Sequence, residues 1–260
     1  MSYTDALGFK IPNGNGSFNS YPIKDVKNYR TRRNITSDLA NLAQAVSEQN
    51  LRKFGYEIGD YFVGASGIEY VLADMNTFKG SSDNYAVVGS NHITIVVNCT
   101  TSSTESDRNT AWGGNTSQGY NGSTLHSHLE NTILPKVKSD FTALFGDWSS
   151  HLIGHQKLFR TGESKWAWGW QAGKLISALT SVQLHGSPVC DLDGTDTGEG
   201  NKPLEVFQKF FYCEVLHNKT IWLRSISASG YPCDAPDYGI ANGLSAASDS
   251  LGAVGLIIFH

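Results

Sequence analysis

The sequence is poor in charged residues, and it contains no long apolar run. Charged side chains make up 17% of its 260 residues, against about 25% in an average soluble domain. With a net charge of −4 the chain lacks the basic surface that would bind nucleic acid or an anionic membrane, so we expect neither partner. The longest apolar stretch, 252–259, is far shorter than the ~18 residues of a membrane span, which predicts no membrane insertion.

Targeting and cysteine motifs are also missing. The first residues show no basic region followed by an apolar one, so no secretory signal is visible and we expect synthesis in a cytoplasm. The four cysteines form no C-x-x-C, which argues against a zinc ribbon and a thioredoxin-like site; they are Cys99, Cys190, Cys213 and Cys233. Two disulfides are possible, but the lack of an export signal favours free thiols.

The sequence has no recognisable catalytic motif. There is no G-x-S-x-G, no H-E-x-x-H and no P-loop. The nearest approaches to a metal site are two histidine pairs and one acidic loop: His126 and His128; His151 and His155; and Asp191, Asp193, Asp196 and Glu199. The pairs lack a third ligand, and the loop has its glycine, Gly194, too early for an EF-hand. We therefore expect no catalytic residue, no bound metal and no cofactor.

Small polar residues and glycine take the place of the missing charges. Glycine accounts for 27 residues, about 10% of the chain against ~7% on average. A surface of Ser, Thr, Asn and Gly is typical of extracellular β-rich proteins, virion components and adhesins. This composition favours a binding or structural role.

The N-terminal region predicts an attachment module. Residues 1–34 are polar, with a turn-rich stretch at 12–21 and a basic cluster that follows it, so we expect an extended arm: either a solvated tail or a peptide that docks on a larger assembly. A helix is expected to follow, with Thr36 or Ser37 as N-cap and one narrow apolar stripe: Ile35, Leu39, Leu42 and Val46. The stripe packs within the chain or associates with other copies, and a homo-oligomer, in particular a trimer, is our expectation.

The remaining sequence predicts strands and helices that do not alternate regularly. Strands are expected over 56–63, 69–78, 92–98, 220–226 and 253–259; helices over 125–145, with a break near Pro135, and 204–211; a strand or mixed element over 176–185; and irregular chain over 151–174 and 227–250. This order is typical of an α+β fold with long loops. We expect two domains: an arm and oligomerisation helix over 1–55, and one domain over 56–260.

The end of the chain carries a resemblance to a known family. A Trp-Leu-Arg-Ser strand (222–225), a long Gly/Ser/Ala-rich loop and a Gly-Val-Gly apolar strand resemble the C-terminal part of C-type lectin-like domains, whose fold is that of the formylglycine-generating enzyme and which occur in phage and bacterial surface proteins. The resemblance covers about 56–260. It departs from the family pattern in the helix, where His126 and His128 stand in place of Arg and Trp, and in lacking Arg-Pro after Val254.

The resemblance implies that the loop before the last strand is a binding surface on a rigid base. Seven residues of this loop are candidate receptor-binding residues: Ser227, Ser229, Tyr231, Asp234, Asp237, Tyr238 and Asn242. They combine tyrosine anchors with small hydrogen-bonding side chains, as antibody binding surfaces do, although an ordinary solvent loop has similar composition. The core beneath it is expected to contain Trp222, Leu223, Val254, Leu256 and Ile258.

The last 36 residues, 225–260, contain no Lys, Glu, Gln, Trp or Met. An asparagine codon that ends in a pyrimidine and is randomised at its two adenines cannot encode any of these five. Diversification by a retroelement, which is known for C-type lectin-like phage proteins, therefore becomes a hypothesis. A buried strand and a glycine-rich loop account for the same composition without it.

Together these features predict a bacteriophage virion protein, a tail- or capsid-associated fibre or adhesin that is not an enzyme. Its expected partners are other virion proteins, through the arm, and a host cell-surface glycan or protein, through the loop. The first alternative is a purely structural virion protein, such as a capsid decoration or a minor tail subunit. The second is an enzyme of the formylglycine-generating type, for which Cys213 and Cys233 are the nearest cysteine pair.

Overall fold

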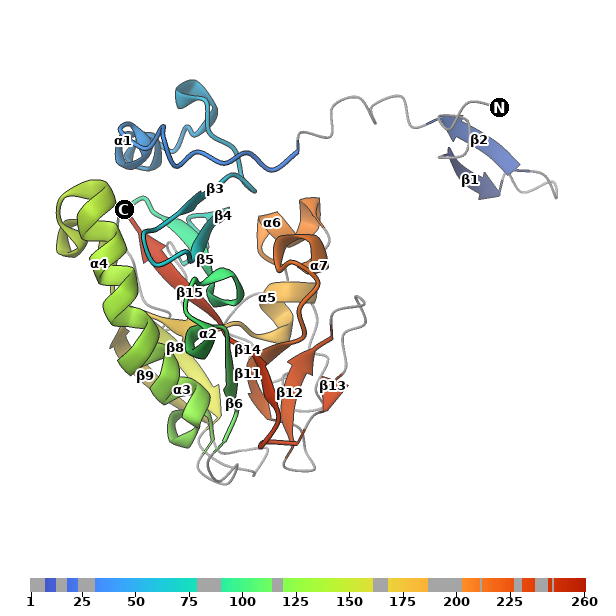
Figure 1. Ribbon diagram of the computed structural model, residues 1–260. Coiled ribbons are helices and arrows are strands. Elements are labelled where there is room, and N and C mark those ends of the chain that lie inside the picture. The colour runs from blue at the N-terminus through green and yellow to red at the C-terminus, as the bar shows by residue number, and fades with distance from the viewer. Residues whose placement is uncertain are drawn as a thin grey trace. The chain divides into compact units, whose positions relative to one another are not determined.

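The chain forms two compact units in a computed structural model, Met1–Arg33 and Asn34–His260 (Figure 1). The structure describes residues 8–12, 18–22, 31–78, 90–113, 119–160, 168–186, 203–210, 212–226, 231–236, 243–244 and 246–260. The expected boundary at 55/56 therefore moves to 33/34. The reason is that the apolar side chains of 35–51 are buried in the second unit, which we call the body.

The first unit contains a β-hairpin in the region expected to be an extended arm. Strands β1 (Gly8–Pro12) and β2 (Phe18–Pro22) pair antiparallel, with Phe9 opposite Tyr21 and Ile11 opposite Asn19. A lone two-stranded hairpin is at best marginally stable in water. The arm therefore has local structure, but too little of it to form a core.

A six-stranded antiparallel sheet forms the centre of the body. The strand order is β10-β15-β5-β4-β3, and β7 also pairs with β15. The bounds are β3 Tyr61–Val63, β4 Glu69–Met75, β5 Ile93–Asn98, β7 Leu152–Ile153, β10 Ser177–Ala178 and β15 Val254–Phe259. Strand β15 pairs with β5 along its full length, from Val254–Asn98 to Phe259–Ile93. The β-branched runs of the sequence thus form strands as expected, because both faces of this sheet are covered, although the strand expected over 56–63 is confined to β3.

The helix expected to begin at Thr36 or Ser37 is much shorter than predicted. Helix α1 spans Leu42–Ser47, and the residues before it run as turns. Ile35 N donates to Tyr61 O (2.8 Å) and Tyr56 Oη donates to Asp38 O (2.8 Å), so tertiary hydrogen bonds hold this stretch against β3 and replace the first helical turns. The apolar stripe is buried in the body of the same chain.

The helix expected over 125–145 forms, with a π-helical turn rather than a break beside Pro135. Helix α3 (Thr124–His128) continues through a π-helical turn (Leu129–Ile133) into α4 (Leu134–Phe145), with Pro135 in the first turn of α4. Pro135 has no N–H to donate to a carbonyl of the preceding turn, and the π-helical turn lies directly before α4. Phe141 of α4 packs on Tyr70 and Phe259, with ring centroids 5.2 and 6.0 Å apart.

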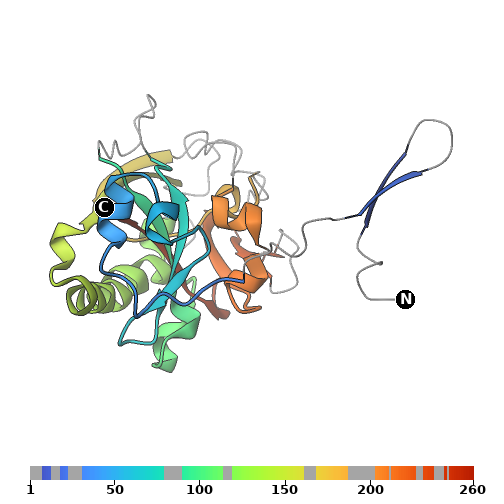
Figure 2. The ribbon, with the colours of Figure 1, turned by 90° about the horizontal axis from the view of Figure 1, so that it is seen from above.

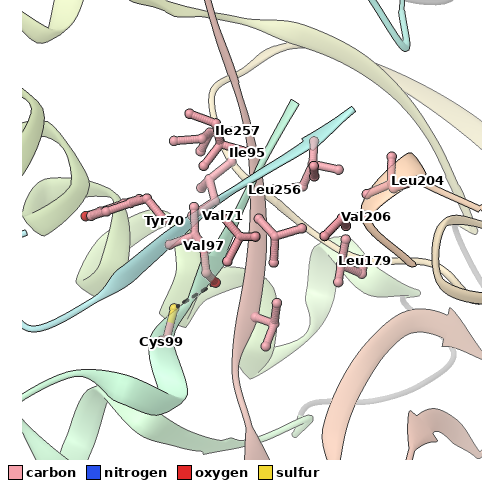
Figure 3. Close-up of a cluster of buried hydrophobic side chains, with 14 of the residues drawn as sticks. Tyr70, Val71, Ile95, Val97, Cys99, Leu179, Leu204, Val206, Leu256 and Ile257 are labelled. Carbon is pink, nitrogen blue, oxygen red and sulfur yellow. Dashed lines mark hydrogen bonds between the residues drawn. The ribbon is translucent and has the colours of Figure 1, made fainter. Parts of the chain in front are cut away.

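The central sheet separates α4 from a second group of helices (Figures 1 and 2). These helices are α5 (Ser181–His185), α6 (Glu205–Lys209) and α7 (Tyr212–Val215). Figure 3 shows the core on this side, where Leu179, Leu204 and Val206 lie near Leu256 of the sheet. Cys99 lies in the same cluster; its sulfhydryl donates to Val97 O (3.7 Å), and burial raises the pKa of its thiol.

A second sheet forms the end of the body that is lower in Figure 1. Its strand order is β13-β12-β11-β14-β6, and β11 pairs parallel with β14 while the other pairs are antiparallel. The bounds are β6 Asn109–Ala111, β11 Ile221–Ile226, β12 Pro232–Ala235, β13 Gly243–Leu244 and β14 Ser250–Gly252. The body is therefore a mixed α/β structure with antiparallel and mixed sheets, which is compatible with an α+β fold. The expectation of irregular chain over 227–250 is wrong for β12 and β13.

A hairpin of β8 (His155–Arg160) and β9 (Trp168–Lys174) stands where irregular chain was expected over 151–174. That prediction is wrong because β9, which contains tryptophans, pairs antiparallel with β8. The segment lacks the alternation of apolar and polar residues that would have indicated a strand. The remaining short elements are α2 Glu105–Arg108 and the 3₁₀ turns Arg52–Phe54, Cys99–Thr101, Tyr120–Gly122 and Trp148–Ser150. Among the described residues, no helix combines the length and the apolar character needed to cross a membrane.

Candidate binding face

The candidate binding residues within the described part of the chain lie on or beside β12. Tyr231 directly precedes this strand and is 52% exposed. Asp234 lies within the strand, opposite Trp222 of β11, and is only 4% exposed. The other five candidates, Ser227, Ser229, Asp237, Tyr238 and Asn242, lie outside the described residues. Tyr231 is therefore the described candidate that is accessible to a partner.

Two buried tryptophans fix the sheet beneath Tyr231. Trp112 Nε1 donates to Leu223 O of β11 (3.1 Å), and Trp222 Nε1 donates to Thr110 O of β6 (2.8 Å). Each indole N–H thus donates to a backbone carbonyl next to the other tryptophan. The two bonds connect β6 and β11, which are far apart in sequence. The expected core residues under this face, Trp222, Leu223, Val254, Leu256 and Ile258, are all buried. Trp112 was missed because it stands in a polar stretch with no periodicity.

Cys233, two residues after Tyr231, is disulfide-bonded. The expectation of free thiols is therefore wrong for Cys233 and holds for Cys99, which is free and buried. The partner of Cys233 lies outside the side chains that the structure describes. The lack of an export signal was therefore the wrong guide to the state of Cys233. This bond restrains the strand that carries Tyr231.

The segment from 246 to 252 is fixed to the same sheet. Gly113 N donates to Ala247 O (2.7 Å), and Ala246 N donates to Asp249 Oδ2 (3.1 Å). Ser250 then pairs with Ala111 across β14 and β6. The end of the candidate loop is thus held by backbone pairing, so it offers a preformed surface rather than a free chain.

The histidine pairs are occupied by structural contacts. His128 Nε2 lies 3.1 Å from Asp107 O, and the His126 ring packs edge-on against Tyr120. His155 stacks on Phe78, while His151 stacks on the last strand. In the part of the chain that the structure describes, no group of three or more His, Cys, Asp or Glu side chains is placed to hold a metal ion. The acidic loop 191–199 lies outside that part.

Two buried carboxylates that the sequence analysis did not single out hold elements together. Asp107 Oδ2 accepts from Ser102 Oγ and Lys136 Nζ, both at 2.6 Å, and so joins α2 to α4. Asp140 accepts from Ser66 N (3.1 Å) and Tyr70 Oη (2.7 Å), which joins α4 to the sheet. Neither carboxylate lines a described pocket, and both serve to position helices.

The chain has no match among protein-family models, curated proteins or solved structures. Its function must therefore be argued from its own residues and their arrangement.

Proposed function

We propose that this chain is a bacteriophage virion protein, a tail- or capsid-associated adhesin whose C-type lectin-like body binds the host cell surface. Tyr231 and the loops beside β12 form the binding face. The N-terminal arm attaches the chain to other virion proteins. The protein acts by binding and not by catalysis.

The observation that carries this proposal is the placement of Tyr231 relative to the start of the body. Asn34, the first residue of the body, bridges to Tyr61 of β3, at the upper end in Figure 1. Strand β12, which Tyr231 precedes, lies at the lower end. Strand β12, and with it Tyr231, thus lies at the end of the body remote from Asn34, the residue at which the body begins. This is the arrangement that an adhesin requires.

The chemistry of the binding face supports the same role. Tyrosine supplies a rigid ring with a polar hydroxyl at low cost in conformational entropy, which is why it is common in binding surfaces. Tyr231 is the exposed large hydrophobic side chain of the described body, and it lies on a sheet fixed by two tryptophans and a disulfide. A preorganised anchor loses less entropy when it binds than a mobile one.

The test is adsorption of the phage that carries a Tyr231→Ala chain. An exposed side chain contributes little to folding, so the melting temperature should stay within the range of an ordinary surface substitution. Loss of an aromatic anchor typically costs ~2 kcal/mol or more, so adsorption should fall about 30-fold.

The matched control is Lys53→Ala, an exposed residue near α1 at the other end of the body. It should leave adsorption unchanged. Normal adsorption by the Tyr231→Ala phage would indicate that another protein binds the receptor, and it would favour the structural virion alternative.

A further inference from the structure

A pocket of about 410 Å³ lies at the end of the body where α1 meets the C-terminal residue. Figures 1 and 2 both place the C-terminus beside α1, and β12 lies at the other end of the body. The pocket is thus separate from the Tyr231 face. Its lining comes from α1, the residues before β5, the 3₁₀ turn before β7 and the chain end: Ala43, Gln44, Ser47, Ser90, Asn91, Ser150, His151 and His260.

Hydrogen bonds fix the walls of this pocket. Asn91 Nδ2 donates to Ser47 O (2.6 Å), which ties the loop before β5 to α1. His260 N donates to His151 O (2.9 Å), and His151 Nδ1 lies 3.2 Å from His260 O. The His151 ring also stacks on Phe259, with the centroids 5.2 Å apart and the planes at 13°. The two histidines are therefore held in place without a ligand.

The side chains of the lining offer hydrogen bonds without a fixed charge. It contains hydroxyls, two amides and two imidazoles, and it has no Lys, Arg, Asp or Glu. Within the described part of the chain, both ring nitrogens of His260 and Nε2 of His151 have no hydrogen-bond partner. Burial and the neighbouring His151 lower the pKa of His260, which favours its neutral form at pH 7.

These features disfavour two other ligand classes. An anion needs a positive charge or a cluster of backbone N–H groups, and the lining supplies no permanent cation. A metal ion needs three or four converging ligands, whereas the described lining supplies two imidazoles. A neutral ligand with several hydroxyl groups matches donors and acceptors of this kind.

We propose that this pocket binds one neutral sugar residue, a hexose or an N-acetylhexosamine, through Gln44, Asn91, His151 and His260. Its volume is within the range of small-molecule sites, about 300–1,000 Å³. The sugar is a second ligand, at the end opposite the Tyr231 face, and the proposal does not depend on the virion role. An open pocket that holds one sugar residue should bind it with a Kd of about 1 mM.

The experiment is saturation-transfer NMR on the full chain with methyl glycosides of glucose, galactose, mannose, rhamnose and N-acetylglucosamine, followed by titration of any that bind. At least one glycoside should bind the unchanged chain. Ser47→Tyr, which fills the pocket from the exposed side of α1, and His260→Ala, which removes two ring nitrogens, should each weaken binding at least about 10-fold.

The matched control is Ser37→Tyr, which adds the same ring at an exposed position that does not line the pocket. It should leave sugar binding unchanged, as should Tyr231→Ala. The proposal is overturned if no glycoside of this panel binds, if Ser47→Tyr binds as well as the unchanged chain, or if Zn²⁺ binds the two histidines and no sugar does. A failure of this kind leaves the adsorption test on Tyr231 unaffected.

Discussion

At the scale of single residues, the body depends on buried carboxylates that accept hydrogen bonds from distant segments. Asp140 is buried in α4 and receives bonds from Ser66 N, Ser66 Oγ and Tyr70 Oη at 3.1, 2.5 and 2.7 Å. All three donors are uncharged groups of the loop before β4 and of β4 itself. Burial raises the pKa of the Tyr70 hydroxyl well above its usual range, which keeps it a donor at all ordinary pH values.

Removal of the Asp140 carboxylate should therefore destabilise the protein strongly. Asp140→Ala leaves the Tyr70 hydroxyl buried without its acceptor, and we expect a loss of about 2–4 kcal/mol in the free energy of unfolding. Urea denaturation measures it, and Ser139→Ala, exposed on the same helix, is the control with little expected change. A loss equal to that of the control would show that α4 is held by its apolar contacts alone.

The Asp107 carboxylate makes a contribution that depends on pH. Burial raises its pKa, but the hydrogen bonds from Lys136 and Ser102 and the charge of Lys136 outweigh burial, so the pKa lies below its usual value. A carboxyl group with a lowered folded pKa stabilises the fold above its unfolded pKa of about 3.9 and loses this effect as the pH falls through the folded pKa.

Asp107→Asn should therefore lower the free energy of unfolding at pH 7, and the difference from the unchanged chain should shrink below about pH 4. Denaturation at pH 7 and pH 3 measures both values. Glu105→Gln, exposed on the same helix, is the control. An unchanged difference between the two pH values would contradict the assignment of a depressed pKa.

The structure describes two of the seven candidate binding residues, and they differ in exposure. Tyr231 is exposed as expected, whereas Asp234 is buried because it lies in a strand that the sequence did not reveal. Gly and Pro near β12 favour the prediction of a loop. A strand of four residues is too short for its period-two pattern to outweigh that prediction. The disulfide at Cys233 could not be predicted, because pairing depends on proximity in space.

At the scale of elements, local sequence predicts where a helix is irregular more reliably than it predicts lengths. The irregularity expected beside Pro135 follows from the chemistry of one residue, and a π-helical turn between α3 and α4 stands there in place of a break. The length of α1 depends on two hydrogen bonds made by the residues before it. Tyr61 O accepts from Ile35 N, and Tyr56 Oη donates to Asp38 O. Periodicity alone does not contain this information.

The disulfide should stabilise the strand next to Tyr231. Cys233→Ser should lower the free energy of unfolding by about 2–4 kcal/mol, the usual contribution of a disulfide. Without reductant, the denatured chain should show fewer reactive thiols than its four cysteines would give, and all four should appear after reduction. Cys99→Ser, at a free cysteine, should not change the number of disulfides. Four thiols without reductant in protein exposed to air would contradict the bond.

At the scale of the whole molecule, the chain consists of a body with a buried core and a first unit whose described strands form one two-stranded hairpin. The two strands of the arm belong to a unit separate from the body. The linking residues contain several Lys and Arg, which are cleavage sites for trypsin. Brief trypsin treatment should cut at Lys24, Lys27 or Arg30 and leave the body intact, as mass spectrometry of the fragments would show. An arm as resistant as the body would mean that it packs on the body.

The longest strands of the central sheet were predictable from sequence, whereas the shorter strands and the pairing of the strands were not. The runs at 69–75, 93–98 and 254–259 are unambiguous because their β-branched residues cover both faces of a buried strand. The pairing of β15 with β5, across most of the chain, follows from packing rather than from local sequence. The same holds for the placement of β12 at the end of the body remote from Asn34.

The most direct test of the central claim is to locate the two ends of this chain on the intact virion. Gold-labelled antibodies against the Tyr231 face and against residues 1–22 would be applied to intact particles and viewed by electron microscopy. The account predicts that the first label binds the outer surface of the tail or capsid, and that the second binds only after the particle is disrupted. Absence of the chain from purified particles, or an accessible arm with a covered Tyr231 face, would contradict it.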